Sequence, residues 1–263
     1  MPSTDDFPLI SVIIPVYNGA AFLPDAFETL RAQAYTPLEI VIVDDGSTDE
    51  SAAIAACACI ETPAWSVRLI RQANAGPSAA RNAGLNATHG DLVQFLDVDD
   101  SLPPNKLRDQ IARLTRQPEL DVFGGYTQAV NLPGANAHNL FFNHPEALLT
   151  FNLGAALFRR RVFERVGIFN PDLCLAEDVD FFFRFIEAGC VLAFTKQVAL
   201  TYRQHETNLT RNETRAANQR ALMRVMHDSL KRRRNPDQTV RPMRELTEFI
   251  EDEAPVDDPQ PDA

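Results

Sequence analysis

Short apolar runs in the first part of the chain alternate with segments of helical spacing, and this alternation limits the fold more than any other feature. The runs cover residues 10–16, 38–43, 67–70 and 92–96. Strands that are joined by single helices and short connections form a mostly parallel sheet with helices on both faces. The sequence therefore predicts an α/β fold whose sheet begins with these strands.

The last of these runs ends in a cluster of carboxylates, Asp97-Val-Asp-Asp100. In extended backbone, Asp97 and Asp99 would project to the same side of the strand. Two carboxylates this close repel each other unless a cation lies between them, and a divalent metal that carries a phosphorylated ligand would supply it. The alternative is an acidic turn before a helix that Pro103 and Pro104 announce. These residues alone leave both interpretations open.

A second acidic strand end, Asp44-Asp45, follows the second run. The carboxyl ends of parallel strands meet at one edge of an open sheet, where ligands bind. Asp45 could accept hydrogen bonds from a base or ribose, or the two carboxylates could cap the next helix. Arg81 could bind a diphosphate bidentately, or it could be a solvated surface residue. The glycine-rich fingerprints of dinucleotide-binding proteins and P-loop ATPases are absent, which disfavours hydride transfer and ATP hydrolysis.

A third acidic pair, Glu177-Asp178, begins a helix whose next turn contains Phe181, Phe182 and Phe183. Burial beside aromatic rings would raise the pKa of a carboxyl group and suit it to general-base catalysis. A position at a helix N-terminus would instead lower the pKa. Both interpretations stay open on these residues.

Composition restricts the partners and the compartment. The net charge of −11 argues against nucleic acid as the main partner, although residues 203–244 are rich in arginine. Four cysteines are few for 263 residues, and we expect buried, reduced thiols. The N-terminus lacks the pattern of a signal peptide, and no apolar run approaches the length of a membrane span. We therefore expect a cytoplasmic protein.

Four sequence blocks occur in the order and spacing of a known family. They are Ser11-Val-Ile-Ile-Pro-Val-Tyr-Asn18, Val41-Ile-Val-Asp-Asp-Gly-Ser-Thr-Asp49, Gly76-Pro-Ser-Ala-Ala-Arg-Asn-Ala-Gly84 and Phe95-Leu-Asp-Val-Asp-Asp100. Together they resemble the family 2 glycosyltransferases, and Glu177-Asp178 falls where the E-D motif of that family lies. The likeness covers roughly residues 8–210.

The resemblance implies a GT-A fold, in which a Rossmann-like nucleotide-binding half is joined to an acceptor half. We therefore expect one domain over residues 1–210, with the first half at about 8–100 and the second at about 101–210. A helical extension at 211–250 and a disordered acidic tail at 251–263 would follow.

The resemblance also implies which residues bind the nucleotide. This set comprises Pro15, Tyr17, Asn18, Asp45, Arg81, Asp97 and Val98. Within it, Pro15 and Tyr17 would line the base pocket, Asp45 would accept a hydrogen bond from the base, and Arg81 would lie beside the diphosphate. Asp97 would be near the ribose or a metal-bound water.

The metal ligands and the catalytic base follow from the same resemblance. Asp99, with Asp97 beside it, would ligate Mn²⁺ or Mg²⁺. His205 resembles the histidine that some members add as a ligand, although a histidine in a loop is also a common surface residue; a nitrogen ligand would favour manganese. Asp178, next to Glu177, would be the catalytic base.

The implied reaction is metal-dependent, inverting transfer of a single sugar from a nucleotide-sugar to a hydroxyl of a glycan or lipid-linked acceptor in cell-surface polysaccharide or glycan synthesis. We expect a UDP-sugar because Asp45 suits the N3–H of uracil, although thymine presents the same group. The Q-x-x-R-W motif of processive synthases is missing, which favours the addition of one sugar.

Two other functions compete with this one. A sugar nucleotidyltransferase has a similar sheet but opens with a glycine-rich, basic loop, where this chain has Pro15-Val-Tyr-Asn18. A catalytically silent sugar-nucleotide or glycan-binding protein is the other alternative, and the presence of Asp99 and Asp178 argues against it.

The C-terminal helix, predicted over about residues 214–233, also has two interpretations. It has Ala217, Leu222, Met226 and Leu230 on one side and several arginines on the other. It could lie on an anionic membrane surface at the inner face of the membrane. It could instead pack on the core domain or on a second subunit as part of a homodimer.

Overall fold

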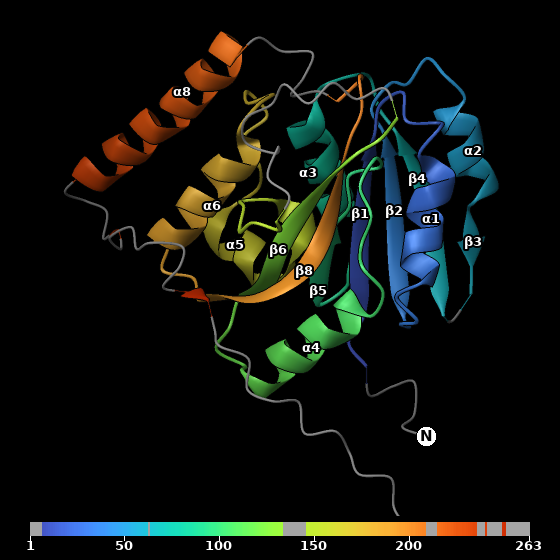
Figure 1. Cartoon of the computed structure of the whole chain (residues 1–263), viewed down its shortest axis with the longest axis horizontal. Coiled ribbons are helices and arrows are strands. Elements are labelled where there is room, and N and C mark those ends of the chain that lie inside the picture. The colour runs from blue at the N-terminus through green and yellow to red at the C-terminus, as the bar shows by residue number, and fades with distance from the viewer. Residues whose placement is uncertain are drawn as a thin grey trace, which may run out of the picture.

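The computed structural model describes residues 7–62, 64–133, 146–208, 215–235, 240 and 249–250. Its centre is one eight-stranded sheet with the order β3-β4-β2-β1-β5-β7-β6-β8 (Figure 1). The pairs β4–β2, β2–β1, β1–β5 and β6–β8 are parallel, whereas β7 is antiparallel to both of its neighbours and β3 is antiparallel to β4. The sheet thus begins as the expected parallel unit and becomes mixed in its second half.

The first half of the chain follows the predicted alternation. Its elements are β1 (Ile10–Val16), α1 (Leu23–Arg31), β2 (Leu38–Asp44), α2 (Ser51–Cys57), β3 (Ile60–Glu61), β4 (Trp65–Arg71), α3 (Pro77–Ala87) and β5 (Leu92–Phe95). All four predicted strands are present, and the short edge strand β3 is an addition. Strands β1 and β2 are buried almost throughout, as expected for central parallel strands that helices cover on both faces.

The second half is less regular. Its elements are α4 (Lys106–Arg116), β6 (Val122–Asn131), η2 (Leu153–Ala155), β7 (Ala156–Arg159), α5 (Arg161–Val166), α6 (Glu177–Glu187), β8 (Leu192–Gln204) and α8 (Arg215–Arg234). The sequence also predicts a long loop at residues 131–145, which contains His138 and His144. Most of this loop falls outside the described residues, and so does the whole acidic tail at 251–263.

Two apolar clusters cover the two faces of the sheet. One contains Ile10, Val12 and Ile14 of β1, which pack with apolar residues of α1, α2 and α4. The other contains Ile13, on the opposite face of the same strand, with apolar residues of α5 and the phenylalanines of α6. Successive residues of a strand point to opposite faces, so β1 contributes to both clusters.

The sequence predicts that Ser47 and Ser78 cap the helices that follow them, but neither of them caps a helix. Helix α2 begins after Glu50 without a side-chain cap, and Ser47 Oγ instead accepts a hydrogen bond from the backbone N–H of Asn18 at 2.9 Å. Helix α3 begins after Gly76, and Ser78 Oγ donates to the carbonyl of Leu173 at 2.9 Å. Both hydroxyls join segments that are distant in sequence, and those tertiary contacts replace the local caps.

The cysteine prediction is wrong for three of the four residues. All four thiols are free, but Cys57, Cys59 and Cys174 are exposed and only Cys190 is buried. The buried residues of α2 are Ser51 and Ala55. Cys57 lies two positions after Ala55, which turns it away from the core.

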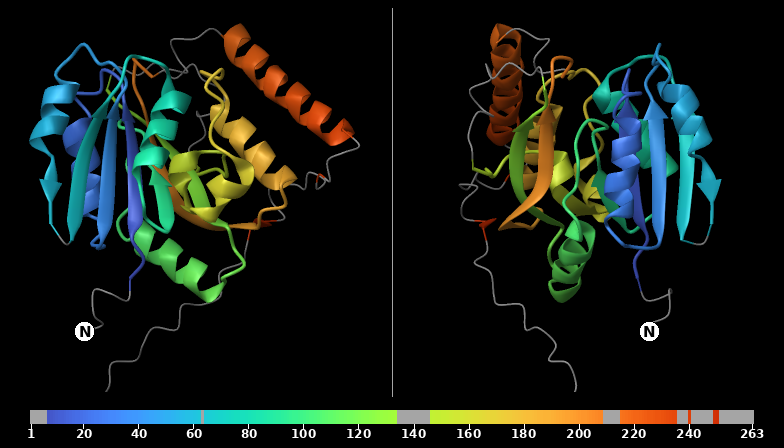
Figure 2. Two further views of the ribbon diagram at one scale, coloured as in Figure 1. Left: turned by 180° about the vertical axis from the view of Figure 1, so that it is seen from behind. Right: turned by 45° about the vertical axis from the view of Figure 1, so that its right-hand side comes forward.

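The C-terminal helix packs against α6, but not through the side that the sequence suggested. Figures 1 and 2 show α8 along the outer side of α6. Its buried residues include Val225 and Ser229, whereas Leu222, Met226 and Leu230 are exposed. Arg232 of α8 pairs with Asp180 and Glu187 of α6, and the side with Leu222, Met226 and Leu230 therefore faces outward. No helix in the described part of the chain is both long and apolar enough to cross a membrane.

Candidate active site

The predicted site residues gather at the carboxyl ends of β1, β2, β5 and β8. The acidic segment after β5 does not have the extended backbone that the sequence suggested, because the strand ends at Phe95 and the N–H of Asp100 donates to the carbonyl of Asp97 at 2.9 Å. The segment is therefore a turn, and Asp97 and Asp99 contact different partners. The turn interpretation describes the backbone, but the two carboxylates are not solvated caps.

Arg81 links two acidic segments that are far apart in sequence. Its guanidinium donates to Glu177 Oε1 at 2.7 Å and to Asp97 Oδ1 at 2.8 Å, and its side chain is only 6% exposed. Burial would lower the pKa of Arg81, but the Asp97 and Glu177 carboxylates outweigh that effect and raise it. Arg81 is therefore a buried, permanently charged residue, and the interpretation as a solvated surface arginine is wrong.

Asp178 lies in the first turn of α6, next to this ion pair. Burial, followed by the charge of Glu177, raises the pKa of Asp178 to about 7, although the N–H of Val179 and the charge of Arg81 oppose the shift. The N–H of Val179 donates to Asp178 Oδ1 at 2.8 Å. The raised pKa, rather than the lowered pKa of a helix cap, describes this group. A carboxyl group that titrates near neutral pH can exchange a proton with a hydroxyl during a reaction.

Helix α3 fixes the position of the segment that leads into α6. The side chain of Asn82 donates to the carbonyl of Phe169 at 2.8 Å and accepts from its N–H at 2.9 Å. Ser78 holds the carbonyl of Leu173 as described above. These contacts, with the Arg81–Glu177 pair, bring Asp178 to the end of the sheet where Asp97 lies.

Asp99, in the turn after β5, and His205, directly after β8, contact each other at the carboxyl edge of the sheet. Asp99 Oδ2 lies 2.9 Å from His205 Nε2, and Asn208 Nδ2 donates to the same oxygen at 2.9 Å. His205 Nδ1 lies 2.8 Å from Thr207 Oγ1, and the Phe22 ring packs on the imidazole with a centroid distance of 4.5 Å. The interpretation of His205 as a plain surface residue is therefore wrong.

The Asp99–His205 pair fits a metal ion that takes its other ligands from a substrate. In the described part of the chain, no three His, Cys, Asp or Glu side chains come close enough to hold an ion together. The 2.9 Å separation is that of an ordinary N···O hydrogen bond, and two ligand atoms of one octahedral ion with bonds of about 2.0–2.1 Å would lie at a similar distance of about 3 Å. Mg²⁺ and similar ions commonly bind to one or two carboxylates together with substrate phosphates.

Sequence reasoning missed the residues that hold this pair in place. The Arg203 guanidinium donates to the carbonyl of Asp99 and to Asp25 Oδ2 at 2.7 Å, and it lies over the Phe22 ring at 5.5 Å. The backbone N–H of Arg203 donates to Asp100 Oδ1 at 3.1 Å. No local pattern marks these partners, because β8 supplies Arg203, α1 supplies Asp25, and Phe22 immediately precedes α1.

Asp100 is buried below this pair and differs from its two neighbours in the turn. Burial, followed by the charges of Asp99 and Asp97, raises its pKa well above the usual range of an aspartate. Its contact with the backbone of β8 fastens the turn to that strand. Asp100 therefore does more than open the following turn.

The residues expected around the base lie on neighbouring loops. Tyr17 is 53% exposed and Pro15 is half-buried at the end of β1. Asn18 adopts a left-handed conformation with φ of 50°, and its side-chain oxygen accepts from the N–H of Thr48 at 2.8 Å. Asn18 thereby joins the loop after β1 to the loop after β2.

The contacts of Asp45 and Val98 differ from those that the resemblance implied. Asp45 accepts hydrogen bonds from Gln72 Nε2 at 2.7 Å and from the N–H groups of Ala75 and Gly76 at 2.9 and 2.8 Å. Asp45 is only 4% exposed, and these hydrogen bonds join the loop after β2 to the loop before α3, so Asp45 is not a cap of the next helix. The Val98 side chain belongs to the apolar core, where a methyl group added at Gly19 would lie 2.7 Å from it.

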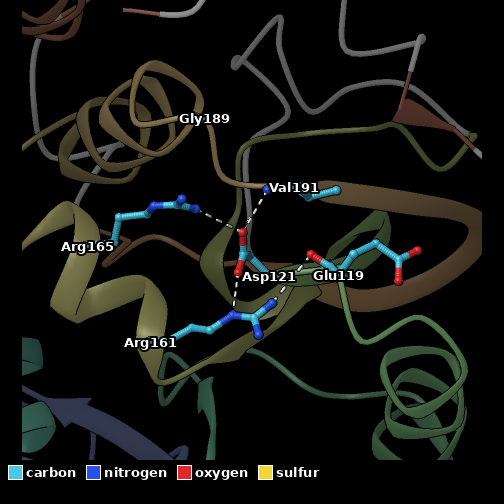
Figure 3. A pocket seen from close by; sticks show the side chains of 6 residues that line it. All are labelled: Glu119, Asp121, Arg161, Arg165, Gly189 and Val191. Carbon is cyan, nitrogen blue, oxygen red and sulfur yellow. Dashed lines mark hydrogen bonds and ion pairs between the residues drawn. The ribbon is translucent and has the colours of Figure 1, made fainter. Parts of the chain in front are cut away.

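A pocket of about 430 Å³ lies at the opposite edge of the sheet, near the amino ends of β6 and β8 (Figure 3). It is lined by Glu119, Asp121, Arg161, Arg165, Gly189 and Val191. Asp121 accepts from Arg161 Nε at 2.6 Å and from the N–H of Val191 at 2.9 Å, and Arg165 lies 3.6 Å away. Its charges are mutually neutralised, and it lies far from the acidic carboxyl edge, so we do not assign the reaction to it.

Comparison with known proteins agrees with this site. The family described as Glycosyl transferase family 2 matches residues 11–167. An uncharacterized glycosyltransferase of Rickettsia typhi is 30% identical over 220 residues, which cover 77% of this chain and 66% of that protein. This chain spans between about a third and two thirds of the length of such relatives.

Two solved structures share the fold. Staphylococcus aureus TarS in complex with UDP-GlcNAc has a TM-score of 0.64 at 20% identity, over 83% of this chain and 66% of the TarS chain. The mannosyltransferase PcManGT from Pyrobaculum calidifontis, in complex with GDP-Man and Mn²⁺, has a TM-score of 0.63 at 20% identity, over 88% and 66%. These similarities confirm the GT-A fold. Because the matching region covers more than half of the sequence and contains the acidic turn after β5, the chain belongs to glycosyl transferase family 2.

Proposed function

We propose that the protein transfers one sugar from a nucleotide-sugar to a hydroxyl group, with inversion at the anomeric carbon and with help from a divalent metal. The observation that carries this proposal is the set of contacts through Glu177, Arg81 and Asp97, which connects the first turn of α6 to the turn that contains Asp99. Asp178 lies in that first turn of α6, and burial raises its pKa to about 7. A proton acceptor and a candidate metal ligand thus belong to one network.

Each residue has a role in this proposal. Asp99 and His205 would hold Mn²⁺ or Mg²⁺, which would neutralise the nucleoside diphosphate as it leaves. Asp178 removes the proton of the acceptor hydroxyl while that oxygen forms a bond to the anomeric carbon. The bond from that carbon to the phosphate oxygen breaks on the opposite face, and its electron pair leaves with the diphosphate. Attack from the opposite face inverts the configuration.

The contacts of Arg81 revise its expected role. Both terminal nitrogens already bind carboxylates, and the side chain is almost fully buried. We infer that Arg81 positions Asp97 and Glu177 and limits the pKa of Asp178, rather than binding the diphosphate directly.

A UDP-sugar remains the proposed donor, with Pro15, Tyr17 and Asp45 around the base. TarS binds UDP-GlcNAc and PcManGT binds GDP-Man on the same fold, so the fold alone does not select the nucleotide. We propose a glycan or lipid-linked acceptor in cell-surface polysaccharide or glycan synthesis, and action at the cytoplasmic side of the membrane.

The test combines a donor screen with two matched variants. Release of nucleoside diphosphate is followed with Mn²⁺ across UDP-, GDP- and dTDP-sugars, and thermal stabilisation reports donor binding. Asp178→Asn should keep donor binding and lower kcat by about a hundredfold to ten-thousandfold. Asp109→Asn, which changes an exposed aspartate in the first turn of α4, is the control and should change neither. Unchanged transfer in Asp178→Asn would contradict the assignment of the base.

The same assay decides between the proposal and its alternatives. Thermal stabilisation by a nucleotide-sugar without turnover, across the donors and a mixture of glycan acceptors, would indicate a catalytically silent binding protein. Release of pyrophosphate from a nucleoside triphosphate and a sugar phosphate would indicate a nucleotidyltransferase.

A further inference from the structure

Helix α8 packs through a polar side and exposes an apolar one. Its Ser229 hydroxyl donates to Glu187 of α6, and Arg232 Nε lies 2.6 Å from the other oxygen of that carboxylate. Val225 is its buried apolar residue. The exposed fractions are 38% for Leu222, 71% for Met223, 50% for Met226 and 50% for Leu230. A surface helix of a globular protein normally has the reverse arrangement, so the exposed side of α8 needs another explanation.

The exposed apolar residues form one strip with a basic border. Positions 222, 223, 226 and 230 are neighbours on a helical surface, because side chains three and four residues apart lie next to each other. Arg220, Arg224 and Lys231 are also exposed and follow one side of the strip. The helix has seven basic residues and one acidic residue, Asp228, in a chain whose net charge is −11.

We propose that this side of α8 binds an anionic lipid surface and lies among the headgroups without crossing the bilayer. The basic border would contact the lipid phosphates, and the methionine and leucine side chains would enter the boundary with the acyl chains. A basic helix on an acidic protein also orients the molecule, because the rest of the chain is repelled by the same surface.

The combination of basic and apolar residues on α8 favours an anionic lipid surface over two other partners, a second copy of the chain and nucleic acid. A symmetric dimer through α8 would place the same patch of each subunit against the other and would bring the basic borders together. Nucleic acid would satisfy the arginines through its phosphates but would leave the methionine and leucine strip without an apolar partner. An anionic bilayer satisfies both parts of the surface.

Helix α8 lies next to the helix that contains Asp178, so lipid binding at α8 would place the active site near the membrane. Val225 packs with Leu173 and Phe183, and Leu173 precedes the first turn of α6, which contains Asp178. A lipid surface held at α8 would keep the active site beside hydroxyl groups of membrane-bound acceptors. Lipid binding itself does not depend on sugar transfer, so the two proposals fail separately.

The electrostatic part is tested by vesicle flotation of the full chain. Vesicles of phosphatidylglycerol and phosphatidylcholine in equal parts should carry the protein at low salt, and vesicles of phosphatidylcholine alone should not. The combined variant Arg220→Glu, Arg224→Glu and Lys231→Glu should lower the binding by about a hundredfold. The control variant Arg31→Glu, Arg108→Glu and Arg116→Glu has the same net charge but changes exposed residues of α1 and α4, and it should retain most of the binding. An equal loss in both triple variants would overturn the proposal.

The apolar part is tested by Met223→Gln, Met226→Gln and Leu230→Gln, which keep the charge and the helix propensity. This variant should bind the anionic vesicles about tenfold more weakly, with an unchanged Tm in solution. Binding equal to that of the original chain would overturn the proposal, as would a dimer in solution that this variant abolishes. Tight binding to double-stranded DNA that the glutamine variant leaves unchanged would also overturn it.

Discussion

The two edges of the sheet contain clusters of the same side chains in opposite proportions. At the carboxyl edge, Arg81 is shared by two carboxylates, and Asp178 stands beside them as a third. At the amino edge, Asp121 is shared by Arg161 and Arg165. Burial, followed by the charge of Glu177, raises the pKa of Asp178 to about 7, whereas Asp121 is paired with two arginines and has the contacts of a structural ion pair.

The largest expected effect comes from removing the shared cation at the carboxyl edge. Arg81→Met leaves neighbouring carboxylates without a counter-charge, and we expect a loss of about 3–5 kcal/mol in the free energy of unfolding. Arg161→Met at the amino edge is the matched control. Its side chain is 50% exposed and Arg165 remains nearby, so we expect a loss below about 1 kcal/mol. Urea unfolding measures both, and similar losses would break the comparison.

A second prediction concerns the aromatic ring that supports Asp99 and His205. Phe22→Ala removes the ring that contacts both the His205 imidazole and the Arg203 guanidinium, and it should weaken Mn²⁺ binding by about tenfold to a hundredfold. Titration followed by the electron paramagnetic resonance of free Mn²⁺ gives the Kd. Phe7→Ala, which removes an exposed ring in edge contact with Tyr35, should leave the Kd unchanged. An unchanged Kd in Phe22→Ala would show that the ring does not position the ligands.

A third prediction uses the pH dependence of Asp178. Because the base must be ionised, kcat/KM should fall about tenfold per pH unit below pH of about 7. Glu177→Gln removes the neighbouring negative charge, so it should lower the pKa of Asp178 and move the acidic limb of the profile to lower pH. If the acidic limb of the profile of Glu177→Gln stays at the same pH, Glu177 does not raise the pKa of Asp178.

The raised pKa of Asp178 also makes the free energy of unfolding depend on pH. The pKa of Asp178 is raised in the folded state, so the folded protein retains a proton between pH of about 4 and 7 that the unfolded chain has lost. The contribution of this group is present at low pH and is lost as the pH rises through about 7. Asp178→Asn should therefore raise the Tm at pH 8 more than at pH 4.

The smallest effect should come from the amino edge. Arg165→Ala removes a half-exposed arginine at 3.6 Å from Asp121, and it should change the free energy of unfolding by less than about 0.5 kcal/mol without altering kcat. A loss of activity in this variant would assign the reaction, in part, to the pocket of Figure 3.

The elements were more predictable than their contacts. Hydrophobic periodicity identified β1, β2 and β5, because central strands must be apolar on both faces. It also identified β4, which lies next to the edge strand and is mostly half-buried. The pairing of Arg81 with Glu177 was not predictable, since it joins residues that are distant in sequence and depends on the packing of α3. The turn at Asp97 could be given only as one of two interpretations, because an apolar strand does not show where its hydrogen bonds end.

The face of α8 was the clearest misjudgement. Apolar spacing normally indicates the buried side of a helix, and Leu222, Met226 and Leu230 follow that spacing. The structure instead buries Ser229 and places the half-buried Arg232 against α6, because both side chains contact the buried Glu187. Sequence periodicity indicates which side of a helix is apolar, but it does not indicate which residues of the protein pack against the helix.

The hydrogen bonds from α3 to the segment before α6 have a mechanical consequence. Asn82 and Ser78 fasten the front half of the chain to residues 169–173, and β7 adds its backbone ladder to β5. We therefore expect the two halves to unfold as one cooperative unit rather than as two hinged bodies. Separate expression of residues 1–100 and 101–263 should yield fragments that fold only when mixed, and calorimetry of the intact chain should show a single transition.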